Sequence, residues 1–140
     1  MYDDSKSAAF RYRVRYAECT AHGELALAGY INLFSEAVAQ ALGERGLLLR
    51  TVTARAGGLR EAGYVVEIQA SPTYDDEVDV DVQLQSLDDH GFTFGCQMRV
   101  ARGGKALATG SLHYEARTSG PDGAGKLPPD LYQRLRDWAA

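Results

Sequence analysis

The stretch from Tyr16 to Gly46 constrains the fold more than any other part of the chain. It combines the end of a strand, a tight turn and one long helix, and no other segment has a helical pattern of that length. The remaining chain has strand-like patterns, up to a short helix at the C-terminus. One long helix among many strands predicts a sheet wrapped around a central helix, which is an α+β architecture.

The long helix is amphipathic. At about 100° per residue, one apolar arc, widened by Ile31 and Leu33, is formed by Tyr30, Phe34, Ala37, Val38, Ala41 and Leu42. Gly43, Arg45 and Gly46 indicate the helix C-terminus. We therefore expect the apolar arc to lie on the concave face of a sheet.

Five segments have strand patterns. Residues 8–17 alternate with period two, which places Tyr12 and Tyr16 on a buried face and the arginines between them on a solvated one. The other four runs are 63–70, 77–87, 92–101 and 106–117, with turns at Asp88–Gly91 and Arg102–Lys105. Short turns between successive strands predict an antiparallel sheet of five or six strands. Its exposed edges and uncovered face predict a homodimer or homotetramer.

The 140 residues predict a single domain spanning 1–140. Residues 118–127, rich in Gly and Pro, are expected to be a mobile linker to an amphipathic helix with Leu131, Leu135 and Trp138 on one side. The net charge of −4 argues against nucleic-acid or membrane binding. Two cysteines are too few for a disulfide framework or a metal site, so neither a metal nor a cofactor is expected. The first residues contain no apolar leader segment, so we expect a cytoplasmic protein.

Two short stretches resemble the hot-dog fold acyl thioesterases of the 4-hydroxybenzoyl-CoA thioesterase and YbgC-like type. The first is Arg15–Gly23, seven residues ahead of Tyr30, and the second is Ser71–Val78 with its proline-containing turn. The resemblance covers nearly the whole chain. It implies a hot-dog fold and hydrolysis of acyl thioesters carried on coenzyme A or an acyl carrier protein.

The sequence departs from this family at one decisive position. The family's catalytic aspartate falls on Thr20, which cannot act as a carboxylate nucleophile or base, and the asparagine that often precedes the helix tyrosine is Gly29. Hot-dog thioesterases of enediyne polyketide pathways show a similar loss, so carrier-bound polyketide chains are an expected substrate class. The same departure keeps open a non-hydrolytic protein that binds acyl chains or shields an intermediate. A dehydratase or isomerase is disfavoured because the helix carries no histidine.

The candidate catalytic residues surround the helix start. The resemblance implies that the backbone N–H of Leu27 polarises the thioester carbonyl, and a helix N-terminus suits that task. Glu18 is a candidate general base, or else it supports the loop. Thr20 either positions a water molecule or is an ordinary turn residue. His22 either transfers a proton or is a solvated side chain. Glu36, opposite the apolar arc, is expected to be exposed or at a subunit interface.

The candidate substrate-binding residues form a second set. Tyr30 either lines the acyl slot or packs in the core, and Gly29 lets a substrate approach the backbone. Tyr64 joins this set from the strand at 63–70. Arg55 and Arg60, together with Arg102 and Lys105, are candidates for binding the phosphates of coenzyme A or an acidic carrier protein, with a solvated surface as the alternative. Cys19 and Cys96 are expected to be structural thiols.

Overall fold

A computed structural model describes residues 7–47, 59–117 and 125–139. Within them lie five strands, two α-helices and one short 3-10 turn. In chain order, these are β1 (Ser7–Arg13), η2 (Tyr16–Glu18), α1 (Leu27–Glu44), β2 (Leu59–Ile68), β3 (Glu77–Leu87), β4 (Gly91–Val100), β5 (Ala106–Ala116) and α3 (Pro129–Ala139).

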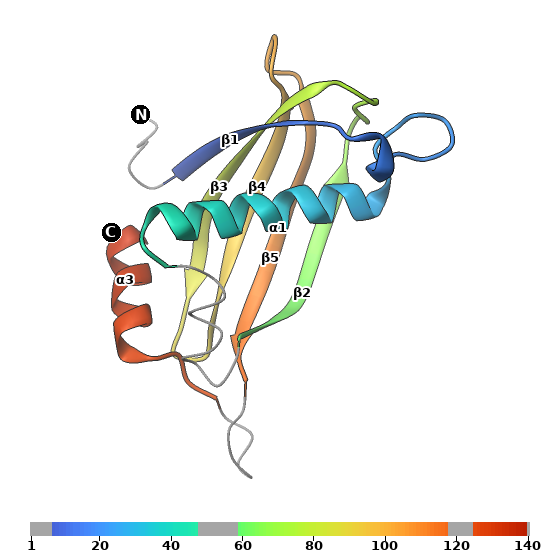
Figure 1. Ribbon diagram of the computed structural model, residues 1–140. Coiled ribbons are helices and arrows are strands. Elements are labelled where there is room, and N and C mark those ends of the chain that lie inside the picture. Colours follow the sequence, from blue (N-terminus) through green and yellow to red (C-terminus); the bar gives the residue numbers. More distant parts are fainter. Residues whose placement is uncertain (1–6, 48–58, 118–124, 140) are drawn as a thin grey trace.

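The strands form one antiparallel sheet in the order β1-β3-β4-β5-β2. Tight turns join β3 to β4 and β4 to β5, because Asp88 accepts the N–H groups of His90 and Gly91 and because Gly103 and Gly104 adopt positive φ angles. Both predicted turns are confirmed. The strands on either side of the long helix in sequence, β1 and β2, end up at opposite edges of the sheet (Figure 1).

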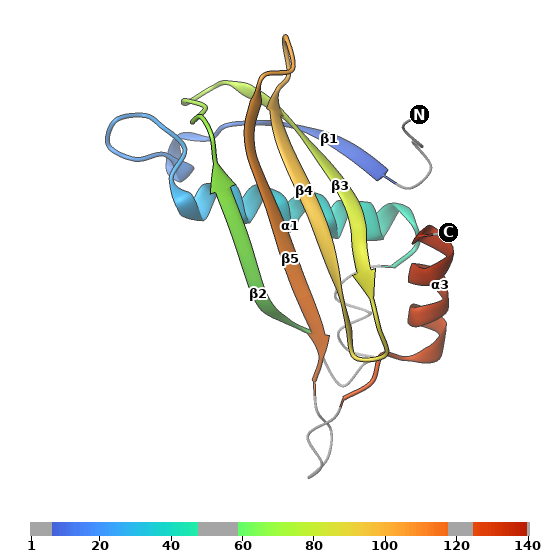
Figure 2. The same cartoon turned by 180° about the vertical axis from the view of Figure 1, so that it is seen from behind.

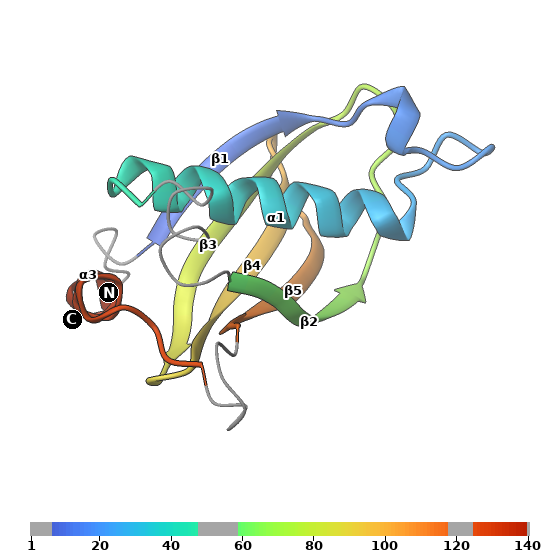
Figure 3. The ribbon, with the colours of Figure 1, turned by 60° about the horizontal axis from the view of Figure 1, so that its bottom comes forward.

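Helix α1 lies across the concave face of the sheet, as Figures 1 and 3 show. The predicted apolar arc is buried, together with Leu33, and Tyr30 and Phe34 have no exposed surface. A close approach of Phe34 to the sheet depends on Gly110 of β5. A Cβ atom at Gly110 would lie 2.7 Å from Phe34 Cε2 and 2.9 Å from the Val65 carbonyl oxygen.

Helix α3 packs beside β3 and the end of α1 (Figure 1). Leu131, Leu135 and Trp138 are buried, as their spacing predicts. The Trp138 ring lies 5.1 Å from that of Phe94, and the Arg45 guanidinium lies 4.1 Å from the Trp138 ring centroid. Aromatic and cation–π contacts therefore hold α3 against the rest of the domain.

The linker predicted at 118–127 falls partly outside the described residues. Its last three residues are bound to the β3–β4 turn: the Leu127 N–H donates to the Asp89 carbonyl at 2.8 Å, and His90 Nδ1 lies 2.8 Å from the Gly125 carbonyl oxygen. Residues 125–127 therefore form an ordered approach to α3.

Two strand boundaries differ from the sequence prediction by four residues, and the others agree within two. The first strand ends at Arg13 and not at residue 17, because η2 turns the chain away, so placing Tyr16 on the buried face was wrong: its side chain is 76% exposed. Strand β2 begins at Leu59, four residues earlier than predicted, because β5 extends far enough to pair Leu59 with Ala116. A bulge between Glu61 and Gly63 interrupts that ladder, which an alternating pattern cannot reveal.

We predict that Gly110→Ala destabilises the domain by about 1–3 kcal/mol, because the new methyl group would collide with Phe34 and the backbone of β2. Chemical denaturation would measure the loss. Gly63→Ala is the matched control on the neighbouring strand, since its added Cβ would meet nothing within 4 Å. Equal effects of the two substitutions would contradict the packing explanation.

Candidate functional site

The start of α1 has no side-chain cap. Ala26 precedes the helix in an extended conformation, and its carbonyl oxygen accepts the N–H groups of Gly29 and Tyr30 at 2.8 and 3.3 Å. Within the described residues, the N–H groups of Leu27 and Ala28 donate to no protein acceptor. Leu27 is 55% exposed, so this end of the helix is open to a ligand. Two free donors at the positive end of a helix dipole form an anion-stabilising site.

Neighbouring backbone segments fix the direction of the helix start. The Ala26 N–H donates to the Glu18 carbonyl at 2.9 Å, and the Leu25 N–H donates to the Pro72 carbonyl at 2.9 Å. Gly29 is buried here, and a Cβ at this position would lie 2.4 Å from Leu25 Cδ1. The structure thus places Gly29 in a close contact within the chain, where it lets the segment 18–25 pack on the helix.

Glu18 lies in the short segment that packs against the helix start. Its side chain is only 10% exposed, and its carboxylate lies 3.0 Å from Arg15 Nε. Arg15 also contacts the carboxylate of Glu36 at 3.5 Å, and Glu36 is 48% exposed, in agreement with its predicted position. Arg15 therefore links the segment before the helix to the third turn of α1 through two carboxylates.

A hairpin closed by the Cys19–Leu25 bridge carries Thr20 and His22. The loop before α1 projects past the start of the helix (Figures 1 and 3). The Thr20 N–H donates to the Glu24 carbonyl at 2.7 Å, and the Thr20 hydroxyl accepts the His22 N–H at 3.2 Å. Gly23 closes the turn with a φ of 83°. Both Thr20 and His22 are exposed. Within one chain the Thr20 hydroxyl thus stabilises the turn, which is the alternative that its sequence context left open.

Tyr30 connects the helix to the segment that follows β2. Its ring is buried, and its hydroxyl lies 3.2 Å from Ser71 Oγ and 3.5 Å from the Ala70 carbonyl oxygen. Burial raises the pKa of this hydroxyl, so it stays protonated at neutral pH. Tyr30 was predicted either to line the acyl slot or to pack in the core, and within one chain its ring packs in the core. Sequence reasoning missed Ser71 as its partner, although Ser71 begins the proline-containing turn.

An exposed apolar group lies near the helix start. The rings of Tyr16 and Tyr74 meet edge to face with centroids 5.7 Å apart, and Tyr74 is 55% exposed. The sequence patterns did not predict this pair, because Tyr16 alternates with buried residues of the first strand. Leu27 at the first position of α1 is also exposed, so three large apolar side chains in this part of the chain are open to solvent.

The candidate residues on β2 lie at the sheet edge. Tyr64 is 57% exposed, and Arg60 forms an ion pair with Glu115 at 3.1 Å. Glu115 also lies 3.2 Å from His113 Nε2, and His113 Nδ1 lies 2.8 Å from the Thr93 hydroxyl. Sequence reasoning missed this outer-face network. Arg55 lies outside the described residues.

In the part of the chain that the structure describes, no group of three His, Cys, Asp or Glu side chains is arranged to hold a metal ion. No described helix is long and apolar enough to span a membrane.

The chain is similar to known proteins in its structure and not in its sequence. The chain matches no family model and no curated protein by sequence. It is similar to a 1,4-dihydroxy-2-naphthoyl-CoA thioesterase from Synechocystis, with a TM-score of 0.85 and 16% identity over 94% of this chain and 96% of the other. It is also similar to the dynemicin thioesterase, whose structures concern polyene binding, with a TM-score of 0.77 and 21% identity over 96% and 98% of the two chains.

A third similar structure is the 4-hydroxybenzoyl-CoA thioesterase from Pseudomonas sp., with a TM-score of 0.76 and 14% identity over 93% of this chain and 99% of the other. At such low identities, these similarities establish a shared fold. The protein therefore has the hot-dog fold, as its two short sequence motifs predicted.

We predict that the two cysteines differ sharply in reactivity. Burial raises the pKa of the Cys96 thiol to about 12, so it carries almost no thiolate, whereas Cys19 is partly exposed. Iodoacetamide at a pH of about 8 should therefore alkylate Cys19 and spare Cys96 until the protein unfolds, as mass spectrometry would show. Rapid labelling of Cys96 in folded Cys19→Ser protein would contradict its assignment as a structural thiol.

Proposed function

We propose that this protein hydrolyses acyl or polyketide thioesters carried on an acyl carrier protein or on coenzyme A. The observation that carries the proposal is the uncapped start of α1, where the N–H groups of Leu27 and Ala28 have no protein acceptor among the described residues and the Leu27 side chain is exposed. The thioesterases with similar structures support this reaction class. The polyene-binding thioesterase among them supports an extended polyketide chain as one substrate class.

In the proposed reaction, the thioester carbonyl oxygen accepts hydrogen bonds from the Leu27 and Ala28 N–H groups. Water adds to the carbonyl carbon and loses a proton, and negative charge grows on the oxygen that the helix start stabilises. The carbon–sulfur bond then breaks, and the thiolate takes up a proton to leave as a thiol beside the free carboxylic acid. No carboxylate nucleophile is required, which fits threonine at position 20.

Glu18 has a supporting role in this proposal. Arg15 neutralises its carboxylate, and its carbonyl oxygen holds the Ala26 N–H, so it fixes the segment that leaves the helix start open. Thr20 and His22 remain predicted site residues, and they reach a substrate only if a bound chain or second subunit covers the hairpin. The two free cysteines suit a reducing compartment, so we propose a cytoplasmic location.

A non-hydrolytic acyl-binding protein is the second candidate. This alternative is favoured by the Thr20 hydroxyl, which accepts the His22 N–H and so stabilises a turn. The resemblance places the family's carboxylate at this position. Binding without turnover would distinguish it from a hydrolase.

Thiol release from a panel of acyl thioesters, presented on coenzyme A and on carrier protein, tests the function directly. We expect turnover on at least one carrier, and preference between the two carriers would identify the natural one. Binding of acyl thioesters with no thiol release on either carrier would establish the non-hydrolytic alternative.

Leu27→Pro tests the helix start itself. Leu27 is the first residue of α1, where proline fits the helix but removes the N–H, and Ala26 already has the extended conformation that a following proline requires. We expect kcat to fall by about 100-fold or more with little change in melting temperature. Leu27→Ala, which keeps the N–H, is the matched control. Full activity of the proline variant would exclude this donor from the mechanism.

We further propose that two chains pair through β2. This strand is at the sheet edge, and Tyr64, Val65 and Ile68 are 57%, 59% and 46% exposed. A ten-residue edge strand with exposed apolar side chains presents unpaired backbone groups with which another chain can pair. Figures 1 and 2 place the start of α1 on the β2 side of the sheet, so the paired subunit would lie beside the candidate site.

We predict that Tyr64→Lys combined with Ile68→Lys converts a dimer into monomers, because edge lysines oppose strand pairing. Light scattering would measure the mass. Tyr74→Lys, which adds a lysine at a similarly exposed tyrosine away from the edge, should leave the mass unchanged. A dimer that survives the double substitution would contradict pairing through β2.

A further inference from the structure

A glutamate, Glu24, lies between the hairpin before α1 and the segment that follows β2. The Cys19–Leu25 bridge closes the hairpin, and the Thr20 N–H donates to the Glu24 carbonyl at 2.7 Å. Thr20 and Glu24 therefore flank the turn as neighbours. On its other side, Glu24 pairs with Thr73 in an antiparallel bridge. Glu24 is thus held by its backbone between two other segments of the chain.

The burial of the neighbouring residues shows to which face the Glu24 side chain belongs. Leu25 and Pro72 are buried, whereas Thr20, Glu24 and Thr73 are exposed. Successive side chains of extended segments alternate between two faces, so the three exposed residues share one open face. Residues directly opposite each other on an antiparallel pair have Cβ atoms about 5 Å apart. The Glu24 side chain therefore lies beside those of the two threonines.

Glu24 also lies close to the uncapped start of α1. Two residues, Leu25 and Ala26, separate it from Leu27, the first residue of the helix. The Leu25 N–H donates to the Pro72 carbonyl at 2.9 Å, and Ala26 is extended, so this short link has a fixed conformation. The carboxylate of Glu24 and the N–H donor of Leu27 therefore lie at the same end of α1.

No cation neutralises this carboxylate. Among the described residues, the side chain of Glu24 forms no ion pair or hydrogen bond, whereas the nearby Glu18 is bound by Arg15. Burial raises the pKa of the Tyr30 hydroxyl, and the negative charge of Glu24 adds to that rise, which places the charge within reach of the first turn of α1. A carboxylate without a partner is free to accept a proton.

We propose that Glu24 is the general base of the thioester hydrolysis. The inference rests on the proposed function, in which the attacking water must lose a proton while the two N–H groups at the helix start can only donate. Glu24 is the carboxylate that the fold holds at that end of the helix without a partner. Sequence reasoning missed it, because its proximity to Thr20 and Thr73 depends on pairing between separate segments.

The proton movements in this step balance. Glu24 accepts a proton from water as the water oxygen bonds to the carbonyl carbon, and the carbonyl oxygen becomes negative at the Leu27 and Ala28 N–H groups. When the carbon–sulfur bond breaks, the protonated Glu24 returns that proton to the departing thiolate. The carboxylate is regenerated, and the products are a free thiol and a carboxylic acid.

Glu24→Gln tests the step, because an amide keeps the size of the side chain but does not take up the proton. In the thiol-release assay we expect kcat to fall by about 100-fold or more, with KM and the melting temperature nearly unchanged. Added formate should restore part of the turnover of Glu24→Ala, since it can accept the proton in the space that the side chain leaves.

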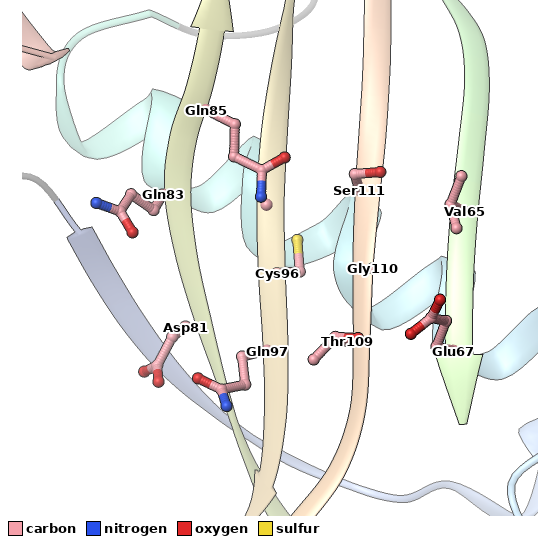
Figure 4. Close-up of a pocket in the computed structure, with 11 residues that line it drawn as sticks. Val65, Glu67, Asp81, Gln83, Gln85, Cys96, Gln97, Thr109, Gly110 and Ser111 are labelled. Carbon is pink, nitrogen blue, oxygen red and sulfur yellow. The ribbon is translucent and has the colours of Figure 1, made fainter. Parts of the chain in front are cut away.

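Glu67→Gln is the matched control. Glu67 is an exposed glutamate as well, but it lines a hollow on the face of the sheet turned away from α1 (Figure 4). The same substitution there should leave kcat unchanged, and formate should not raise the turnover of this variant or of the unmodified protein.

The other outcomes separate this inference from the proposed function. Thiol release by the unmodified protein together with full kcat in Glu24→Gln would exclude Glu24 as the base and leave the hydrolase in place. A change in KM or melting temperature alone, or a Glu24→Ala variant that formate does not rescue, would assign Glu24 to binding or to the helix dipole and overturn the proposal. No thiol release by the unmodified protein from any thioester would refute both.

Discussion

The contact between Phe34 and Gly110 sets the distance between α1 and the sheet, and much of the structure depends on that distance. Because the glycine has no side chain, the phenyl ring packs against the strand backbone and the whole apolar arc of the helix is buried. The buried arc fixes the rotation of α1, and that rotation leaves Glu36 on the exposed side of the helix. The contact that builds the core therefore also holds α1, and with it the helix start, at a fixed distance from the sheet.

A site made from backbone N–H groups has different sequence requirements from one made of side chains. The donors of Leu27 and Ala28 survive most substitutions, provided that no cap occupies them, and the extended Ala26 offers no side-chain oxygen. The surrounding segment is then constrained chiefly to hold the helix start in place, through the Glu18 and Pro72 carbonyls. Threonine at position 20 is compatible with this arrangement, because the two N–H donors do not depend on that side chain.

The sequence predicted the elements that depend on local periodicity and missed those that depend on contacts between distant segments. The strand at 77–87, the helical arc and the short C-terminal helix follow from patterns within each segment, and all three are present. The exposed position of Tyr16 follows from a 3-10 turn that alternation cannot detect. The Arg60–Glu115 and Thr93–His113 pairs join residues 55 and 20 positions apart, so they become visible only once the strand register is known.

Strand β3 shows how one sequence can specify two surfaces. Its valines face the helix, while its outward residues change from Asp79 and Asp81 to Gln83 and Gln85. The change follows the available cations: the two aspartates face Arg11 and Arg99, whereas Gln83 is flanked in the sheet by Ser7 and Gly95. Neither Ser7 nor Gly95 offers a positive charge, so a carboxylate at position 83 would have no partner on the two neighbouring strands. An amide needs no cation, because it can both donate and accept hydrogen bonds, and the switch from acid to amide therefore follows the charges that the neighbouring strands provide.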